Sequence, residues 1–544
     1  MLPLFRGQSK VYSDVTRAVE NLISNHDPDV LAGRRVGLER ECLRVDGEGR
    51  IAQSDHPQTL GAPLTHPHIT TDFSEALIEM VTPPVAGGTA ALGYLENLHR
   101  YVARKLENGE IFWNTSMPCL LDGSESVRIG QYGSSHNGVM KHVYRRGLAL
   151  RYGRRMQAIA GIHFNFSMPD AAFAPGGFGK ASGPDGTPTV TQDDITRGYF
   201  RMTQNLQRIG WLVPYLFGAS PAVCPSFLGE GEGEELERFG NTRFAPEGTS
   251  LRMGRIGYRY RDDEPINLAV RHTCFEDYVG DIIDHVTAPH PPYEKLGLHD
   301  ASGALQQLSV NRLQIENEFY SSVRPKQIPE RGEFPIMALK RRGIRYLELR
   351  SLDVNLFHPA GLDVDTVAAI ELLMLHCWLA DPHPLDATDM VRIAENMRRV
   401  AHDGRQPGLE LETSHGTVAL ADWARDILEP LRPLAAWLDR NETEPRYVRA
   451  LDTQLARVED PSLTPSARML EQVFDTGSFS GVVLALSRRQ HEAHLAAPLD
   501  AAFEREMDAL AASSLADQSA LEAASSGSFE AFLTGLFAQL GGKQ

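Results

Sequence analysis

The feature that most constrains the fold of this chain is a short run in which acidic and apolar residues alternate. Residues 37–45 read GLERECLRV, and such alternation is typical of a β-strand. Successive side chains of a strand point to opposite faces, so Glu39 and Glu41 share one face with two apolar residues. A partly apolar face is usually covered, and covered carboxylates need cations or a shifted pKa. The run indicates either a metal ion beside these acids or an exposed strand with ordinary ion pairs.

Other runs of the chain also predict strands. Residues 162–167, 313–320 and 346–350 alternate in the same way, residues 76–82 are an apolar run with the single acid Glu79, and residues 249–260 predict a strand and a turn. We expect these strands to have a polar and an apolar face, with Glu79, His163 and Glu348 on polar faces. Strands of this kind form an antiparallel sheet with helices behind it and something polar in front.

Longer apolar stripes predict helices over residues 13–26, 89–108, 144–156, 194–217 and 364–379. Beyond residue 386, helix-forming residues dominate and helix stop signals recur. We therefore expect an α+β fold in two parts. Residues 1–380 form a catalytic domain with the sheet, and residues 381–544 form a mostly helical region that packs as scaffold. Two Gly-rich loops, 169–193 and 229–248, are candidates for lids.

Composition excludes several classes of protein. The 544 residues carry a formal charge of −17, which argues against binding to nucleic acid or to an anionic membrane. No apolar run approaches the roughly 18 residues of a membrane span. The five cysteines are scattered and odd in number, so they form no disulfide framework and favour a reducing cytoplasm. The sequence contains no P-loop, no Rossmann fingerprint and no zinc signature.

The acids on the predicted strand faces are candidates for a shared metal site. The residues concerned are Glu39, Glu41, Glu79, Glu348, Asp72, Glu316 and His163. Hard oxygen ligands of this kind suit Mg²⁺ or Mn²⁺, and Mg²⁺ commonly completes its ligand shell with substrate phosphates. Arg350 shares a strand face with Glu348, where it meets either a transferring phosphoryl group or only its neighbouring carboxylate.

Six runs of the sequence carry a further signal: GLERECLRV from residue 37, ITTDFSEALIE from 69, GIHFNFS from 161, PYLFGASP from 214, LQIENE from 313 and YLELRSLD from 346. In this order they closely resemble glutamate–cysteine ligase of the proteobacterial type, and the likeness runs from about residue 34 to 480. The resemblance implies a fold akin to glutamine synthetase. In that fold a curved antiparallel sheet forms a cradle for ATP, glutamate and divalent metal ions.

The resemblance also implies roles for single residues. The implied metal ligands are Glu39, Glu41, Glu79, His163 and Glu348, with Asp72 close by. Arg350 resembles the residue that contacts the γ-phosphate, and with Glu348 it is the catalytic pair. The implied lining of the cysteine pocket is Arg252, Tyr258, Tyr320 and Tyr132.

The reaction implied by the resemblance joins the γ-carboxylate of L-glutamate to the amine of L-cysteine at the expense of ATP. It proceeds through γ-glutamyl phosphate and gives γ-glutamylcysteine, ADP and phosphate, the first step of glutathione synthesis. Two alternatives remain: a related ligase that uses another amine, and a metal-dependent regulatory protein without turnover. We expect a monomer with only small-molecule partners.

Overall fold

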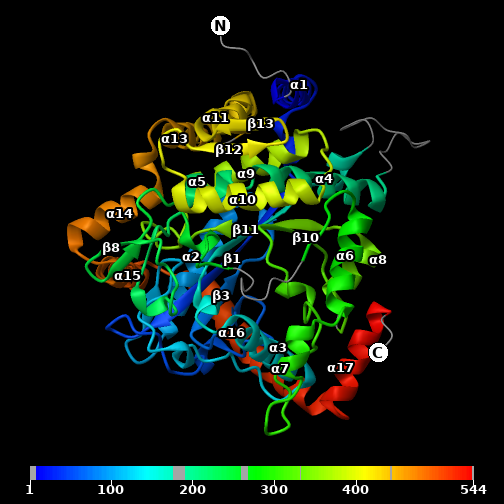
Figure 1. The fold of residues 1–544 in the computed structure, drawn as a ribbon, viewed down its shortest axis with the longest axis vertical. Coiled ribbons are helices and arrows are strands. Elements are labelled where there is room, and N and C mark those ends of the chain that lie inside the picture. Colours follow the sequence, from blue (N-terminus) through cyan, green and yellow to red (C-terminus); the bar gives the residue numbers. More distant parts are fainter. Residues whose placement is uncertain (1–7, 175–189, 259–267, 331, 442–443, 542–544) are drawn as a thin grey trace.

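A computed structural model describes residues 8–174, 190–258, 268–330, 332–441 and 444–541. Its centre is an eight-stranded sheet (Figure 1) in which every pairing is antiparallel. The main path of the sheet runs β10-β11-β6-β1-β3-β2, and β4 and β5 also pair with β1. The strands are β1 (Arg35–Val45), β2 (Ile69–Thr71), β3 (Leu77–Val81), β4 (Val85–Ala86), β5 (Ile111–Trp113), β6 (Ile162–Ser167), β10 (Val323–Lys326) and β11 (Tyr346–Leu352).

The register of the sheet sets its acidic residues side by side. Glu39 of β1 lies opposite His163 of β6, and Glu41 lies opposite Glu79 of β3. Glu348 of β11 lies opposite the next polar residue of β6, Asn165. Directly opposed residues have Cβ atoms about 5 Å apart, so four strands deliver their polar side chains to one region of one face.

Helices cover the apolar face of the sheet. They are α2 (Gly88–Lys105), α4 (Gln192–Ile209), α5 (Leu212–Phe217) and α9 (Val364–Leu379), which pack against the strands or one another. The single helix predicted over residues 194–217 is in fact two, α4 and α5, separated at Gly210. Pro214 explains the break, because its missing N–H and its ring are tolerated only in the first turn of a helix.

The predicted strand over residues 313–320 is wrong: this stretch holds only a short 3-10 helix at Glu316–Glu318. Its polar residues alternate because they are buried in a network and not because they face water. Glu318 is fully buried, and its Oε1 accepts hydrogen bonds from Arg151 (2.8 Å) and from the Tyr152 hydroxyl (2.7 Å). The edge strand is instead β10, whose proline is compatible with an edge position.

This network makes Arg151 important for stability. Replacing Arg151 by methionine leaves the Glu318 carboxylate buried without its cation, and we expect the free energy of unfolding to fall by about 3–5 kcal/mol. Denaturant unfolding of the variant measures this loss. The double variant Arg151→Met/Glu318→Gln removes both charges and should regain part of the stability. A loss in Arg151→Met below 1 kcal/mol would contradict a tight buried pair.

Two further predicted segments differ from the structure. Residues 249–253 contain a 3-10 helix, Leu251–Met253, with a single bridge between Ser250 and Ser220, so the strand predicted from residue 249 is wrong in its described part. The loop 229–248 contains a hairpin of β8 (Glu237–Phe239) and β9 (Thr242–Phe244). Most of the other loop, residues 175–189, lies outside the described residues.

The remainder of the chain is mostly helical, as predicted. It comprises α10 (Ala387–Asp403), α11 (Leu420–Leu428), α12 (Arg432–Leu438), α13 (Tyr447–Glu459), α14 (Pro465–Thr476), α15 (Phe479–Ala496), α16 (Ala501–Ala524) and α17 (Phe529–Phe537), with a hairpin of β12 (Glu410–Thr413) and β13 (Gly416–Ala419). The earlier helices are α1 (Gln8–Asn25), α3 (His136–Tyr152), α6 (Phe275–Thr287), α7 (Pro291–Leu296) and α8 (Pro335–Arg342). Both the α+β class and the helical C-terminal region are thus confirmed. The domain boundary after residue 380 stays a prediction. Within the described residues, no helix is long and apolar enough to cross a bilayer.

Candidate active site

A cavity of about 560 Å³ lies over the polar face of the sheet. Strands β1, β3, β6, β10 and β11 supply its floor, and α3 with several loops supplies its walls. The sequence-predicted residues that line it are Glu39, Glu41, Asp72, Glu79, His163, Arg252, Tyr258, Tyr320, Glu348 and Arg350. Residues up to about 300 positions apart in the sequence therefore converge on one space.

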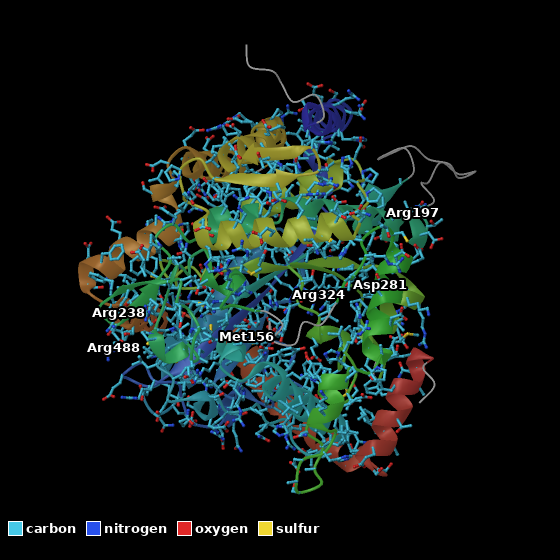
Figure 2. The ribbon with its side chains drawn as sticks, viewed as in Figure 1. Met156, Arg197, Arg238, Asp281, Arg324 and Arg488 are labelled. Atoms are coloured by element: carbon cyan, nitrogen blue, oxygen red, sulfur yellow. The ribbon has the colours of Figure 1, made fainter. Side chains whose placement is uncertain are left out.

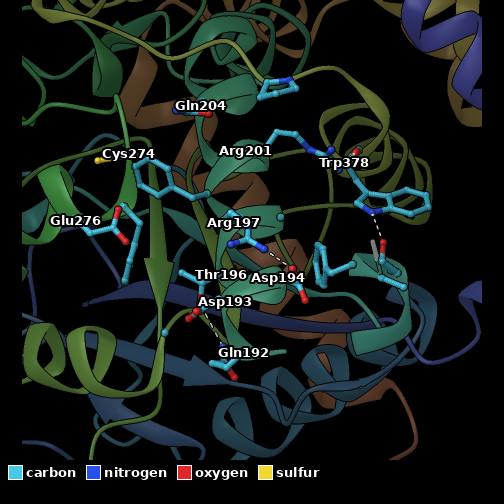
Figure 3. Close-up of a pocket in the computed structure, with 18 of the residues that line it drawn as sticks. Gln192, Asp193, Asp194, Thr196, Arg197, Arg201, Gln204, Cys274, Glu276 and Trp378 are labelled. Carbon is cyan, nitrogen blue, oxygen red and sulfur yellow. Dashed lines mark hydrogen bonds and ion pairs between the residues drawn. The ribbon is translucent and has the colours of Figure 1, made fainter. Parts of the chain in front are cut away.

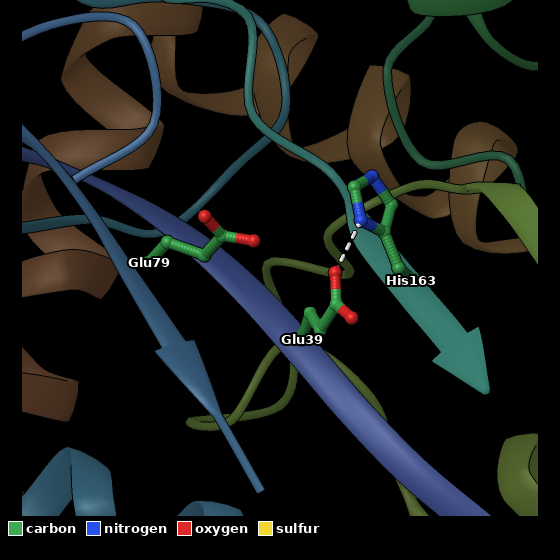
Figure 4. Close-up of side chains that lie close together, drawn as sticks. All are labelled: Glu39, Glu79 and His163. Carbon is green, nitrogen blue, oxygen red and sulfur yellow. Dashed lines mark hydrogen bonds and ion pairs between the residues drawn. The ribbon is translucent and has the colours of Figure 1, made fainter. Parts of the chain in front are cut away.

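At the floor of the cavity, Glu39, Glu79 and His163 form a compact cluster (Figure 4). One ligand atom from each lies within 4.8 Å of the others. The Glu39 Oε2 atom lies 2.8 Å from His163 Nδ1, and Asn165 Nδ2 donates to the other Glu39 oxygen, also at 2.8 Å. These contacts fix the Glu39 carboxylate and the imidazole ring. Their ligand atoms, together with one from Glu79, therefore surround a single position.

Two more carboxylates surround this cluster. Glu41 Oε1 lies 3.7 Å from His163 Nε2, while its second oxygen accepts the backbone N–H of Gly161 at 2.6 Å. Glu348 Oε1 lies 3.9 Å from His163 Nδ1. Both side chains are almost fully buried. Four carboxylates thus gather around one imidazole.

Burial and mutual repulsion shift the pKa values of these carboxyl groups. Burial, together with the negative charges of Glu39, Asp72 and Glu41, raises the pKa of Glu79 well above its ordinary value. Burial, together with the negative charge of Asp72, also raises the pKa of Glu41. A divalent cation among these oxygens would remove the repulsion, so carboxylates plus one imidazole are a donor set that fits Mg²⁺ or Mn²⁺.

Cations line the side of the cavity next to Glu348. Its two oxygens lie 3.4 Å from Lys326 Nζ and 3.1 Å from Arg350 Nη1. Burial opposes ionisation of Glu348, but these cations outweigh it and hold its pKa well below the usual range. Arg324 (Figure 2), on the same edge strand as Lys326, donates to the Asn317 carbonyl at 2.9 Å and fastens the neighbouring loop. This side of the cavity suits an anionic group.

Another part of the cavity wall is aromatic. The rings of Tyr258 and Tyr320 lie 5.6 Å apart, and the Tyr258 hydroxyl donates to the Ile159 carbonyl at 2.7 Å. The Arg252 guanidinium lies beside Tyr258 and donates to the Arg350 carbonyl at 2.7 Å. A Cβ at Gly161 would lie 2.1 Å from Arg252 Nη2, so this arginine position requires glycine there.

Comparison with known proteins identifies the family. The model of the glutamate–cysteine ligase family matches residues 19–400. A glutamate–cysteine ligase from Alcanivorax borkumensis is 43% identical over 93% of this chain and 96% of its own length. The chain belongs to the glutamate–cysteine ligase family. A ligase of the same name from Azotobacter vinelandii is 42% identical over 93% of this chain and 94% of its own.

Solved structures agree with this ligase fold. The crystal structure of the Francisella tularensis glutamate–cysteine ligase, in complex with AMP, has a TM-score of 0.85 and 33% identity. The match covers 93% of this chain and 97% of that one. A bifunctional glutathione synthetase from Pasteurella multocida shares the fold, with a TM-score of 0.65 and 24% identity over 86% of this chain and 53% of its own.

Not every predicted residue of the ligase reaches the cavity. Tyr132 is not among the described residues that line it; its hydroxyl donates to the Asp72 carbonyl at 2.8 Å. It therefore supports the loop that carries Asp72. Glu316 is turned away, because its Oε1 accepts the Ile336 backbone N–H at 2.7 Å. The short 3-10 helix that replaces the predicted strand accounts for this orientation.

Several lining residues of the ligase escaped the sequence analysis. They are Lys141, Tyr144, Arg145, Leu148, Gln157, Lys326, Phe532 and Leu536. Burial and the nearby Arg145 lower the pKa of Lys141 to about 8. Its α3 neighbours recur at helical spacing along one helix face, a signal that the sequence did contain. Phe532 and Leu536 of α17 are also four positions apart, but nothing in the sequence places this helix beside the cavity.

A larger hollow of about 1630 Å³ lies elsewhere, between α4 and α6 (Figure 3). Its polar groups are largely paired with one another: Arg197 forms an ion pair with Asp194, and the Trp378 indole donates to the Ala172 carbonyl. None of the predicted site residues lines it. The smaller cavity over the sheet is therefore the candidate active site.

Proposed function

We propose that the cavity over the sheet is where this ligase joins L-glutamate to L-cysteine, with ATP as the energy source, and that Glu39, Glu41, Asp72, Glu79, His163 and Glu348 hold divalent metal ions there. The observation that carries the proposal is the convergence of Glu39, Glu79 and His163 within 4.8 Å beside the cationic side of the cavity. AMP in the Francisella relative supports a nucleotide as substrate. The metal would be Mg²⁺ or Mn²⁺.

A bound divalent ion would neutralise phosphate charge and orient the terminal phosphoryl group. The chain supplies the remaining positive charge through Arg350 and Lys326. Burial disfavours the charge of Arg350, but Glu348 and Glu41 raise the pKa of its guanidinium above the ordinary value. Arg350 therefore stays protonated and can contact the phosphoryl group as it transfers to the γ-carboxylate of glutamate.

Phosphorylation activates the carboxylate for attack. Oxide is not a leaving group at neutral pH, whereas phosphate is, so the γ-glutamyl phosphate reacts with an amine. The cysteine nitrogen attacks the acyl carbon, the bond to phosphate breaks, and the amine loses a proton. Arg252, Tyr258 and Tyr320 would position the cysteine, with Tyr132 acting at a distance through the Asp72 loop. Catalysis is then positioning and charge stabilisation.

The direct test is the mass of the product after incubation with ATP, glutamate and cysteine. We expect γ-glutamylcysteine, with ADP released in equal amount. Replacing cysteine by other amino acids in parallel distinguishes a ligase for another amine. Faster ADP release with a different amine would show that this amine, and not cysteine, is the preferred acceptor. No glutamate-dependent ADP release with any amine would favour a regulatory protein.

We also propose that the ligase acts as a monomer in the cytoplasm. All five cysteines are free, and four of them are buried, which supports a reducing compartment. Light scattering in solution should give the mass of one chain, 60.1 kDa. A mass of twice this value would overturn the monomer.

A further inference from the structure

The last helix of the chain reaches the candidate active site. Phe532 and Leu536 of α17 line the same cavity as the acidic cluster. The family model ends at residue 400, far before this helix in the sequence. In Figure 1, α17 runs beside α3 toward α8, on the opposite side of the sheet from α9. The end of the chain thus supplies part of the wall.

One end of α17 is fixed to the start of α3. The His136 ring lies 5.1 Å from the Phe532 ring and 6.2 Å from the Phe529 ring. Helix α16 strengthens this junction, since Glu522 Oε1 accepts the Ser134 backbone N–H at 2.9 Å. The Ser525 hydroxyl oxygen accepts the backbone N–H of His136 at 3.2 Å.

The other end of α17 is fixed to the segment that precedes α8. The Phe537 and Phe334 rings lie 5.4 Å apart. Gln539 accepts the Phe334 backbone N–H at 3.4 Å and donates to the Gly332 carbonyl at 2.7 Å. Both Gly332 and Phe334 line the cavity. Helix α17 therefore bridges two walls of the cavity and presents apolar side chains between them.

An apolar wall has a specific use in this reaction. An acyl phosphate reacts with water as well as with an amine. In the side reaction the water oxygen attacks the acyl carbon, the bond to phosphate breaks, and glutamate, phosphate and a proton result. ATP is then consumed without product. A cavity that excludes water suppresses this loss.

We propose that Phe532 and Leu536 exclude water from the cavity and thereby direct the activated glutamyl group to an amine. This inference rests on the proposed function, since it requires the acyl phosphate. It makes the two side chains specificity-determining residues for amine over water. Both residues act on the fate of the intermediate and not on its formation.

The test is the ratio of ADP released to γ-glutamylcysteine formed, in the full-length protein with saturating substrates. In Phe532→Ala and in Leu536→Ala we expect this ratio to rise at least about twofold over the parent, because water reaches the acyl phosphate. Phe532→Leu keeps the apolar bulk and should restore the parent ratio. If one alanine variant fails to fold, the other carries the test.

The matched control is Phe474→Ala on α14. This aromatic side chain is 44% exposed and contacts Phe239 and Phe244, outside the cavity, so its removal should leave the ratio unchanged. A fall in turnover of the α17 variants at an unchanged ratio would show a merely structural helix and overturn the inference. Failure of the parent protein to form γ-glutamylcysteine would instead refute the proposed function.

Discussion

Replacing Glu348 by glutamine should lower the rate of glutamate-dependent ADP formation by about 10³-fold. Glu348 is almost fully buried among Lys326, Arg350 and His163. Glutamine keeps the size of the side chain but removes a negative charge where a divalent ion is proposed to bind. The variant should need a higher concentration of Mg²⁺ for half-maximal activity and should lose its remaining activity in a chelator.

The control for this variant is Glu330→Gln, which removes the same charge from an exposed side chain that pairs with Arg342. It should be as active as the parent protein. Circular dichroism and thermal unfolding establish that the Glu348 variant is folded. Near-parent turnover in folded Glu348→Gln at the parent concentration of Mg²⁺ would remove Glu348 from the metal site.

The position of the acidic residues on strands explains why much of this site could be predicted from the sequence. On β1, β3, β6 and β11 the alternation has period two, and one face is apolar because helices cover it. Any acid on the other face of such a strand must then lie on the side of the sheet that these helices do not cover. The convergence of Glu39, Glu79, His163 and Glu348 follows from adjacent antiparallel strands, without knowledge of any loop.

Alternation failed as a predictor at residues 313–320, whose polar side chains bond to α3 and to one another and not in a sheet. Residues 313–320 alternate as well as β1 does, yet Gln314 and Glu318 are fully buried and satisfied by hydrogen bonds. The pattern records which side chains share an environment and does not reveal whether that environment is water or an ion pair with Arg151. The true edge strand β10 carries a proline, which lowers its strand signal.

The docking of α17 on α3 was beyond a sequence-based prediction. Phe532 has no local pattern that relates it to Glu39, and only the docking of α17 on α3 brings it to the cavity. The helical character of the C-terminal region could be predicted from composition, but its contribution to the site could not. Propensity determines local structure, whereas tertiary packing determines which residues share a cavity.

Replacing Arg350 by alanine should reduce turnover by about 10³-fold while the KM for glutamate changes far less. The guanidinium is held at 3.1 Å from Glu348 and faces the cavity. Its proposed role is to stabilise the charge that spreads over the phosphoryl group during transfer, and that charge is greatest in the transition state. An interaction of this kind affects kcat more than substrate binding.

Two variants sharpen this test of Arg350. Arg350→Lys keeps the charge but loses the planar fork, so we expect turnover between those of the parent and of Arg350→Ala. Arg345→Ala removes an exposed arginine five residues earlier that pairs with Asp170, and it should behave as the parent. Steady-state rates with glutamate and ATP varied separately yield kcat and each KM. A change confined to the KM for glutamate would mean that Arg350 binds a substrate carboxylate, because ground-state binding alone leaves kcat intact.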